Sequence, residues 1–152
     1  MERGMRAKMN NVTKFSISRP AHEVFEAFVD PAKIGNFWFS TSSDRWEAGK
    51  SITLRYEEYN ARVAINVTEV VPNQKIVFVW EGPGEEHVVT ITLQEVEQSR
   101  TVIEVVETGF SQADLEYVSK LVDNKEGWVF VLSCLKAYLE FGVKQLRAGL
   151  VK

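Results

Sequence analysis

The fold of this chain is decided by residues 126–147, EGWVFVLSCLKAYLEFGVKQLR. The stretch contains no proline, and its apolar residues recur at helical spacing over an unusually wide arc. The centre of the arc is formed by Trp128, Val131, Leu132, Leu135, Tyr138, Leu139 and Leu146, and a narrow polar stripe by Ser133, Lys136, Glu140, Lys144 and Arg147. A helix that is apolar around most of its circumference needs cover on several sides. We therefore predict a long C-terminal helix gripped by a curved sheet.

The residues before this helix predict the sheet. Apolar and polar side chains alternate along four runs. Their apolar members are Ile52, Leu54 and Tyr56; Val63, Ile65 and Val67; Ile76, Phe78 and Trp80; and Val89, Ile91 and Leu93. Turn signals at residues 72–74, 82–84 and near Gln98-Ser99 join neighbouring runs, which should therefore pair antiparallel. With further strands at 12–18 and 101–108, we expect six or seven strands.

The remaining segments complete an α+β pattern. A short helix is expected from Pro20 to Asp30-Pro31, with a second helical turn through Ile34. Ser111 is an N-cap candidate with Asp114 three residues later, so a helix should begin there and pause at residues 123–125. Residues 1–11 are expected to be a flexible lead-in, and residues 12–152 a single domain.

Composition excludes several classes of function. The formal net charge of -3 provides no basic field for phosphates, which argues against nucleic acid as the partner. No apolar run is long enough to span a membrane. The single cysteine, Cys134, allows no intrachain disulfide, is expected to act as a small hydrophobe, and fits a reducing cytoplasm.

No catalytic or cofactor motif is present. The sequence lacks a glycine-rich phosphate loop, a nucleophile elbow and a Cys-x-x-Cys pair. With His22 and His87 as the only histidines, a metal site is not expected. We therefore assign no catalytic residue, no metal and no cofactor.

Four stretches resemble the activator of Hsp90 ATPase homologue 1-like branch of the START-like (SRPBCC) superfamily. They are residues 20–31 with Trp38, residues 69–80, residues 107–110, and residues 126–128 with Leu132, Leu135 and Leu139. The resemblance implies a helix-grip fold, also called START-like or Bet v 1-like, with a cavity between sheet and helix. Across that superfamily the cavity holds lipids, polyketides, hormones and other apolar molecules.

His87 and Glu107 are the candidates for a polar site. His87 shares the parity of Val89 and Ile91, and Glu107 shares that of Ile103 and Val105. A hairpin turning near Gln98 would bring both to the same end of adjacent strands, where they could orient a ligand's polar end or exchange a proton with it. In the alternative interpretation both are solvated residues at the rim, and a one-residue slip in register would turn Glu107 to the other face.

The large side chains of the inner surface predict the binding site. The predicted ligand-binding residues are Trp38, Tyr56, Phe78, Trp80, His87, Glu107, Trp128, Leu132 and Leu135. Buried Trp and Tyr need partners for their polar atoms, and a ligand or water in a cavity could supply one, although each residue could instead belong to a filled core. The Tyr56 hydroxyl is a further candidate for orienting the ligand.

Three functions follow as hypotheses. The first is binding of a small hydrophobic ligand between the sheet and the C-terminal helix. The others are a stress-linked protein related to activators of Hsp90 ATPase, with a chaperone as partner, and a cyclase- or hydrolase-type enzyme that uses the same cavity. Phe130 and Phe141, on the flanks of the helix, could be covered by other elements or contribute to a homodimer.

Overall fold

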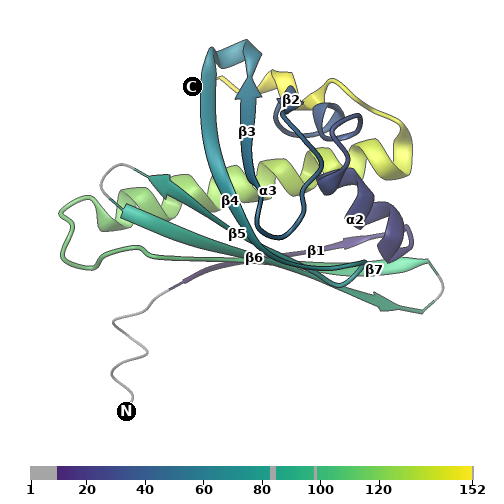
Figure 1. Ribbon diagram of the computed structural model, residues 1–152, viewed down its shortest axis with the longest axis horizontal. Helices are drawn as coiled ribbons and strands as arrows, with labels where there is room; N and C mark the ends of the chain where they lie inside the picture. The colour runs from purple at the N-terminus through teal and green to yellow at the C-terminus, as the bar shows by residue number, and fades with distance from the viewer. Residues whose placement is uncertain (1–9, 83–84, 98, 152) are drawn as a thin grey trace.

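A curved antiparallel sheet and one long helix dominate the computed structural model, which describes residues 10–82, 85–97 and 99–151 (Figure 1). The strands in these ranges are β1 (Asn11–Ile17), β2 (Thr41–Ser42), β3 (Ser51–Tyr56), β4 (Ala61–Val71), β5 (Lys75–Gly82), β6 (Glu85–Val96) and β7 (Arg100–Thr108). The helices are α2 (Ala21–Val29) and α3 (Tyr117–Phe141), with short turns η1 (Ile34–Asn36), η2 (Glu57–Tyr59) and η3 (Leu146–Gly149). This arrangement confirms the predicted α+β helix-grip fold, including two short helical segments after the first strand.

The sheet has the order β1-β7-β6-β5-β4-β3-β2, and every neighbouring pair is antiparallel. The predicted alternation holds on the inner face, where Ile52, Ile65, Ile76 and Ile91 are fully buried. The β4–β5 turn is at residues 72–74 as expected. The other two turn predictions involve Pro83, Gly84 and Gln98, which lie outside the described residues.

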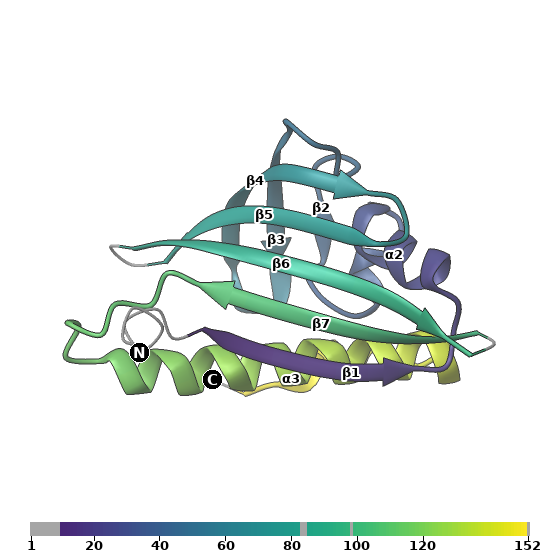
Figure 2. The same ribbon diagram turned by 90° about the horizontal axis from the view of Figure 1, so that it is seen from below.

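Helix α3 lies against the inner side of the sheet and runs alongside β1 (Figure 2). Leu132 and Leu135 are fully buried at its centre, in the same core as Phe78 of β5. Helix α2 packs on β6 and β7 and also contacts α3. Burying these apolar faces together supplies most of the driving force for this arrangement.

The predicted start of the last helix is wrong. Helix α3 begins at Tyr117 rather than after Ser111, and it continues through residues 123–125 without a pause. Ser111 and Asp114 form successive turns instead, in which the Asp114 side chain accepts the backbone N–H of Glu116 at 2.8 Å. Asp and Ser side chains favour such local turns because they compete for backbone N–H groups.

The predicted end of that helix is also wrong. It ends at Phe141 because Gly142 adopts a left-handed conformation with φ of +71°, and the Gly142 N–H bonds the Tyr138 carbonyl at 3.0 Å. Glycine takes this conformation at low cost and commonly terminates helices. Leu146 and Arg147 therefore lie beyond the helix, in η3, and leave its predicted apolar arc and polar stripe.

Arg147 is buried instead of solvated, with 6% of its surface exposed. Its guanidinium makes a bidentate pair with Glu58 at 2.8 and 3.0 Å and lies over the Tyr56 ring, 4.7 Å from its centroid. It also donates to Ser40 Oγ and to the backbone carbonyl of Trp38. These contacts fasten the segment after α3 to β3 and η2.

Among the residues that the structure describes, no helix has both the length and the apolar content that crossing a bilayer would require.

We predict that Glu58→Gln destabilises the protein in a pH-dependent manner. Arg147, chiefly through its hydrogen bonds, lowers the pKa of Glu58 to about 2 from an ordinary value of 4.5. A lowered folded-state pKa stabilises the protein above the unfolded value, and that stabilisation is lost as the pH falls from about 4.5 towards 2. We expect a loss of about 1 kcal/mol at pH 7, a small value because the Glu58 side chain is 38% exposed.

Urea unfolding of both proteins between pH 7 and pH 2.5 measures this difference. Exposed Glu57 provides the control, since Glu57→Gln should change the unfolding free energy little at any pH. A Glu58→Gln effect that persists undiminished at pH 2.5 would contradict the assignment.

Candidate functional site

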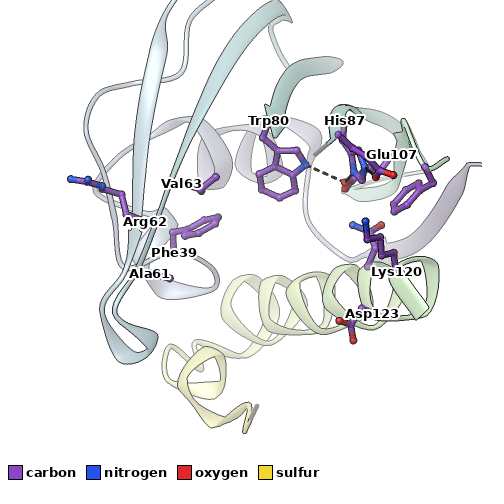
Figure 3. Close-up of a pocket in the computed structure, with 12 residues that line it drawn as sticks. Phe39, Ala61, Arg62, Val63, Trp80, His87, Glu107, Lys120 and Asp123 are labelled. Carbon is purple, nitrogen blue, oxygen red and sulfur yellow. Dashed lines mark hydrogen bonds and ion pairs between the residues drawn. The ribbon is translucent and has the colours of Figure 1, made fainter. Parts of the chain in front are cut away.

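A cavity of about 570 Å³ lies between the sheet and α3 (Figure 3). Its lining residues are Phe39, Ala61, Arg62, Val63, Trp80, Glu85, His87, Glu107, Phe110, Lys120, Asp123 and Asn124. Figure 3 shows Phe39, Ala61 and Val63 at one end, where the Arg62 side chain points away from Trp80, and His87 and Glu107 at the other end, with Trp80 between them. The cavity therefore has an apolar end and a polar end.

Glu107 is the centre of the polar end and is 1% exposed. Its Oε1 accepts the indole N–H of Trp128 at 2.8 Å, and its Oε2 accepts the indole N–H of Trp80 at 3.1 Å. Indole N–H groups only donate, so both carboxylate oxygens act as acceptors. His87 Nδ1 lies 2.6 Å from the same Oε2 and is the donor, because an ionised carboxylate oxygen only accepts. One buried carboxylate thus joins strands β5, β6 and β7 to helix α3.

The His87 ring is fixed on several sides. The Phe110 ring lies against it, with a centroid separation of 4.4 Å. Gly109, with φ of +112°, lets the chain pass close to His87, since a Cβ there would lie 2.4 Å from the Glu86 carbonyl oxygen and 2.9 Å from His87 Cδ2. Glycine is therefore required at 109 by both conformation and space. The segment after β7 holds the imidazole in place.

A second carboxylate, Glu85, occupies the other nitrogen of the ring. His87 Nε2 lies 2.7 Å from Glu85 Oε1, and because an ionised carboxylate oxygen only accepts, this nitrogen is the donor. This hydrogen bond is the main reason that the pKa of Glu85 is lowered, with smaller contributions from the Ser111 N–H and Lys120. Lys120 itself pairs with Asp114. The polar end therefore contains charges that are paired with one another.

A smaller cavity of about 250 Å³ lies beside the first and shares Trp80, Asp123 and Asn124 with it. Three tryptophans, Trp38, Trp80 and Trp128, line it, with ring centroids 5.1 to 6.2 Å apart. Its other lining residues are Tyr56, Gly127, Phe130, Val131 and Leu150. The two cavities therefore meet at Trp80, and aromatic rings form most of the wall of the smaller one.

The structure brings most of the predicted site residues together. Trp80, His87 and Glu107 line the larger cavity, and Trp38, Tyr56, Trp80 and Trp128 line the smaller one. His87 and Glu107 are 7% and 1% exposed, so the interpretation as solvated rim residues is wrong. The register pairs Glu107 with Val89, which puts Glu107 on the same face as His87.

Three of the predicted ligand-binding residues lie in the core and not at either cavity. Phe78, Leu132 and Leu135 are fully buried and line neither of these two cavities, so in this structure they fill the core. The Tyr56 hydroxyl already donates to the Arg147 carbonyl at 2.8 Å, and burial raises its pKa to about 12. Cys134 is buried, and burial raises the pKa of its thiol to about 11, as expected of a thiol that packs as a small hydrophobe.

Sequence reasoning missed several residues of the site. Glu85 has the same strand parity as His87, and that signal could have identified it. Phe110 and Lys120 carried no such signal, because their positions depend on the turns between β7 and α3.

Within the described residues, no group of His, Cys, Asp and Glu side chains is arranged to hold a metal ion. Glu85 and Glu107 bond opposite nitrogens of His87, so the three cannot share one ion.

Comparison with known proteins identifies similar chains. The family model described as Activator of Hsp90 ATPase homolog 1-like protein matches residues 18–140. The crystal structure of protein SSP2350 from Staphylococcus saprophyticus is 51% identical over 90% of this chain and 95% of that chain, with a TM-score of 0.79. No match was found among curated proteins.

Two further solved structures are more distant. DynU16, described as a putative protein in the dynemicin biosynthetic locus, is 25% identical over 89% of this chain, with a TM-score of 0.77, and the match spans 48% of DynU16. The Aha1 dimer from Colwellia psychrerythraea is 19% identical over 88% of this chain and 98% of that chain, with a TM-score of 0.74. At 19% identity, the similarity to the Colwellia protein is evidence for the fold alone.

We predict that Glu107→Gln destabilises the protein by about 1–3 kcal/mol. A glutamine has one carbonyl oxygen for two indole N–H groups, so its amide would face a donor and leave a buried hydrogen bond unmade. Urea unfolding measures the change. Glu104→Gln is the matched control, since Glu104 lies on the same strand and its partly exposed side chain is 3.6 Å from Lys14. Equal effects of the two substitutions would contradict the role of Glu107.

Proposed function

This chain belongs to the activator of Hsp90 ATPase homolog 1-like family, and we propose that it binds a small, mostly apolar molecule in the cavity between the sheet and α3. The observation that carries this proposal is the cavity itself, which has an apolar end at Phe39 and Val63 and a buried charged cluster at the other. Its volume of about 570 Å³ lies in the range of small-molecule sites.

The cost of the polar cluster supports a binding role. Buried ionic groups add a desolvation cost that apolar residues of similar size would avoid. A fold that served stability alone would not need three ionisable side chains beside this pocket. An open space that ends at Glu85, His87 and Glu107 is better explained by a ligand that fills it.

The shape of the cavity suits a ligand that has an apolar body and a polar group at one end. Apolar groups would contact Phe39, Ala61, Val63 and the face of Trp80, where burial from water favours binding. A polar group would reach the cluster around His87. The likeness to DynU16, a protein of a biosynthetic locus by its description, is compatible with a small organic ligand.

We expect the neutral fluorescent probe N-phenyl-1-naphthylamine to bind the purified protein saturably, with a rise in emission. Val63→Trp should weaken this binding at least tenfold, because the larger side chain occupies the apolar end of the cavity. Val88→Trp is the matched control. Val88 is also a half-buried strand valine, but it alternates with His87 and so faces the other side of β6.

Native mass spectrometry of the same samples gives the stoichiometry and reveals any molecule that copurifies with the protein. The absence of saturable binding by the native protein, or equal weakening by both valine substitutions, would contradict the proposed site.

A second candidate function rests on the family match alone. The family is described by its relation to an activator of Hsp90 ATPase, so this chain could act on a chaperone of that class. If it does, adding saturating protein to a purified Hsp90-type chaperone should raise its ATPase rate at least twofold. An unchanged rate would remove this candidate and leave the cavity proposal intact.

Self-association stays a prediction. Phe141 is 71% exposed, whereas Phe130 is partly buried and lines the smaller cavity. The Colwellia protein is described as a dimer, which is a statement about that protein.

A further inference from the structure

The members of the polar cluster differ in how firmly they are held. Glu107 accepts three hydrogen bonds and is 1% exposed. Glu85 is the first residue of β6, and it bonds His87 Nε2 at 2.7 Å and the Ser111 N–H at 3.4 Å. Its side chain is 13% exposed and lines the cavity. Glu85 is therefore the member that can move away from His87 at the smallest cost.

We propose that Glu85 is a displaceable partner of His87 and that the ligand is a neutral apolar molecule whose polar end is a hydroxyl group. The hydroxyl inserts between the two side chains, where its oxygen accepts a hydrogen bond from His87 Nε2–H and its O–H donates a hydrogen bond to Glu85. This inference rests on the proposed cavity function and names the chemistry of the ligand's polar end.

A hydroxyl matches this pair because it both donates and accepts. His87 Nε2 and Glu85 Oε1 are 2.7 Å apart, and they present one donor and one acceptor next to each other. Separating them exposes two buried charged groups, and an inserted group must satisfy both to avoid a large desolvation cost. An ether oxygen satisfies the donor only, and a hydrocarbon satisfies neither.

Charged head groups fit less well. A ligand carboxylate would accept from His87 but would meet the negative charges of Glu85 and Glu107. A ligand ammonium would bond Glu85 but would meet the donating ring of His87. Lys120 already pairs with Asp114, so it supplies no uncompensated positive charge for an anion. The neutral hydroxyl leaves the charge balance of the cluster unchanged.

Glu107 and Phe110 make this recognition directional. The hydrogen bond from Nδ1 to Glu107 and the contact with the Phe110 ring fix the orientation of the imidazole. Its Nε2 therefore keeps the same direction when Glu85 moves away. Trp80, which donates to Glu107, also lines the cavity beside this edge. A flat aromatic body would contact the Trp80 indole while its hydroxyl reaches Nε2.

Three probes of nearly equal shape test the inference: 2-naphthol, 2-methoxynaphthalene and naphthalene. They are titrated into the native protein and followed by NMR of the histidine rings and the indole N–H groups. The chain has two histidines and four tryptophans, so the signals are few. We expect 2-naphthol to bind about tenfold more tightly than 2-methoxynaphthalene, the value of one hydrogen bond to a charged group. It should shift the signals of His87 and leave those of exposed His22 unchanged.

The variant Glu85→Ala isolates the role of Glu85. Without it, Nε2 is open to any acceptor and the hydroxyl has no partner for its hydrogen, so the preference for 2-naphthol over 2-methoxynaphthalene should fall from about tenfold to about one. Glu86→Ala is the matched control, because exposed Glu86 is the next residue of the same strand, and it should keep the preference. Thermal unfolding of both variants checks that they fold.

The outcomes separate this inference from the proposed function. If all three probes bind the native protein equally, or if Glu85→Ala keeps the preference, the cavity proposal stands and the hydroxyl inference is overturned. If none of the probes binds, both are overturned. A preference that disappears in Glu85→Ala and persists in Glu86→Ala supports the inference.

Discussion

The buried carboxylate of Glu107 is the interaction on which the rest of the site depends. A buried charge is tolerated only when hydrogen bonds compensate for its lost hydration. Here the donors come from β5, β6 and α3, through Trp80, His87 and Trp128. Each donor is a large ring, so satisfying one carboxylate also orders the aromatic wall of the cavity. The helix is therefore tied to the sheet by a directional contact as well as by apolar packing.

A second ion pair fastens the segment after the helix to the sheet. After Gly142 ends α3, the chain returns to the sheet, where Arg147 pairs with Glu58 and covers Tyr56. Both polar contacts join segments that are distant in the sequence, and both lie beside the cavities rather than in the centre of the core.

The alternation of apolar and polar residues along the strands and their helical spacing near the C-terminus made the fold predictable. They also made two members of the polar cluster predictable, His87 and Glu107. Strand parity gave the shared face of His87 and Glu107, and the β6–β7 register confirmed that they lie together. Parity could not distinguish residues that line a cavity from those that fill a core, so Phe78, Leu132 and Leu135 were grouped with the cavity residues. Arg147 was assigned to a polar stripe because helical spacing was extended past Gly142. Glycine commonly follows the last residue of a helix, and in the structure the left-handed conformation of Gly142 ends α3.

The sequence by itself determined the sheet, its inner face and the long apolar helix, because alternation and helical spacing are local properties of the chain. It also determined the family resemblance. Tertiary structure alone decided that Glu107 receives two indole N–H groups, that Glu85 bonds the second nitrogen of His87, and that Arg147 is buried. These contacts join residues 20 to 89 positions apart or depend on turn geometry, and only the relative placement of strands and helix fixes which side chains meet.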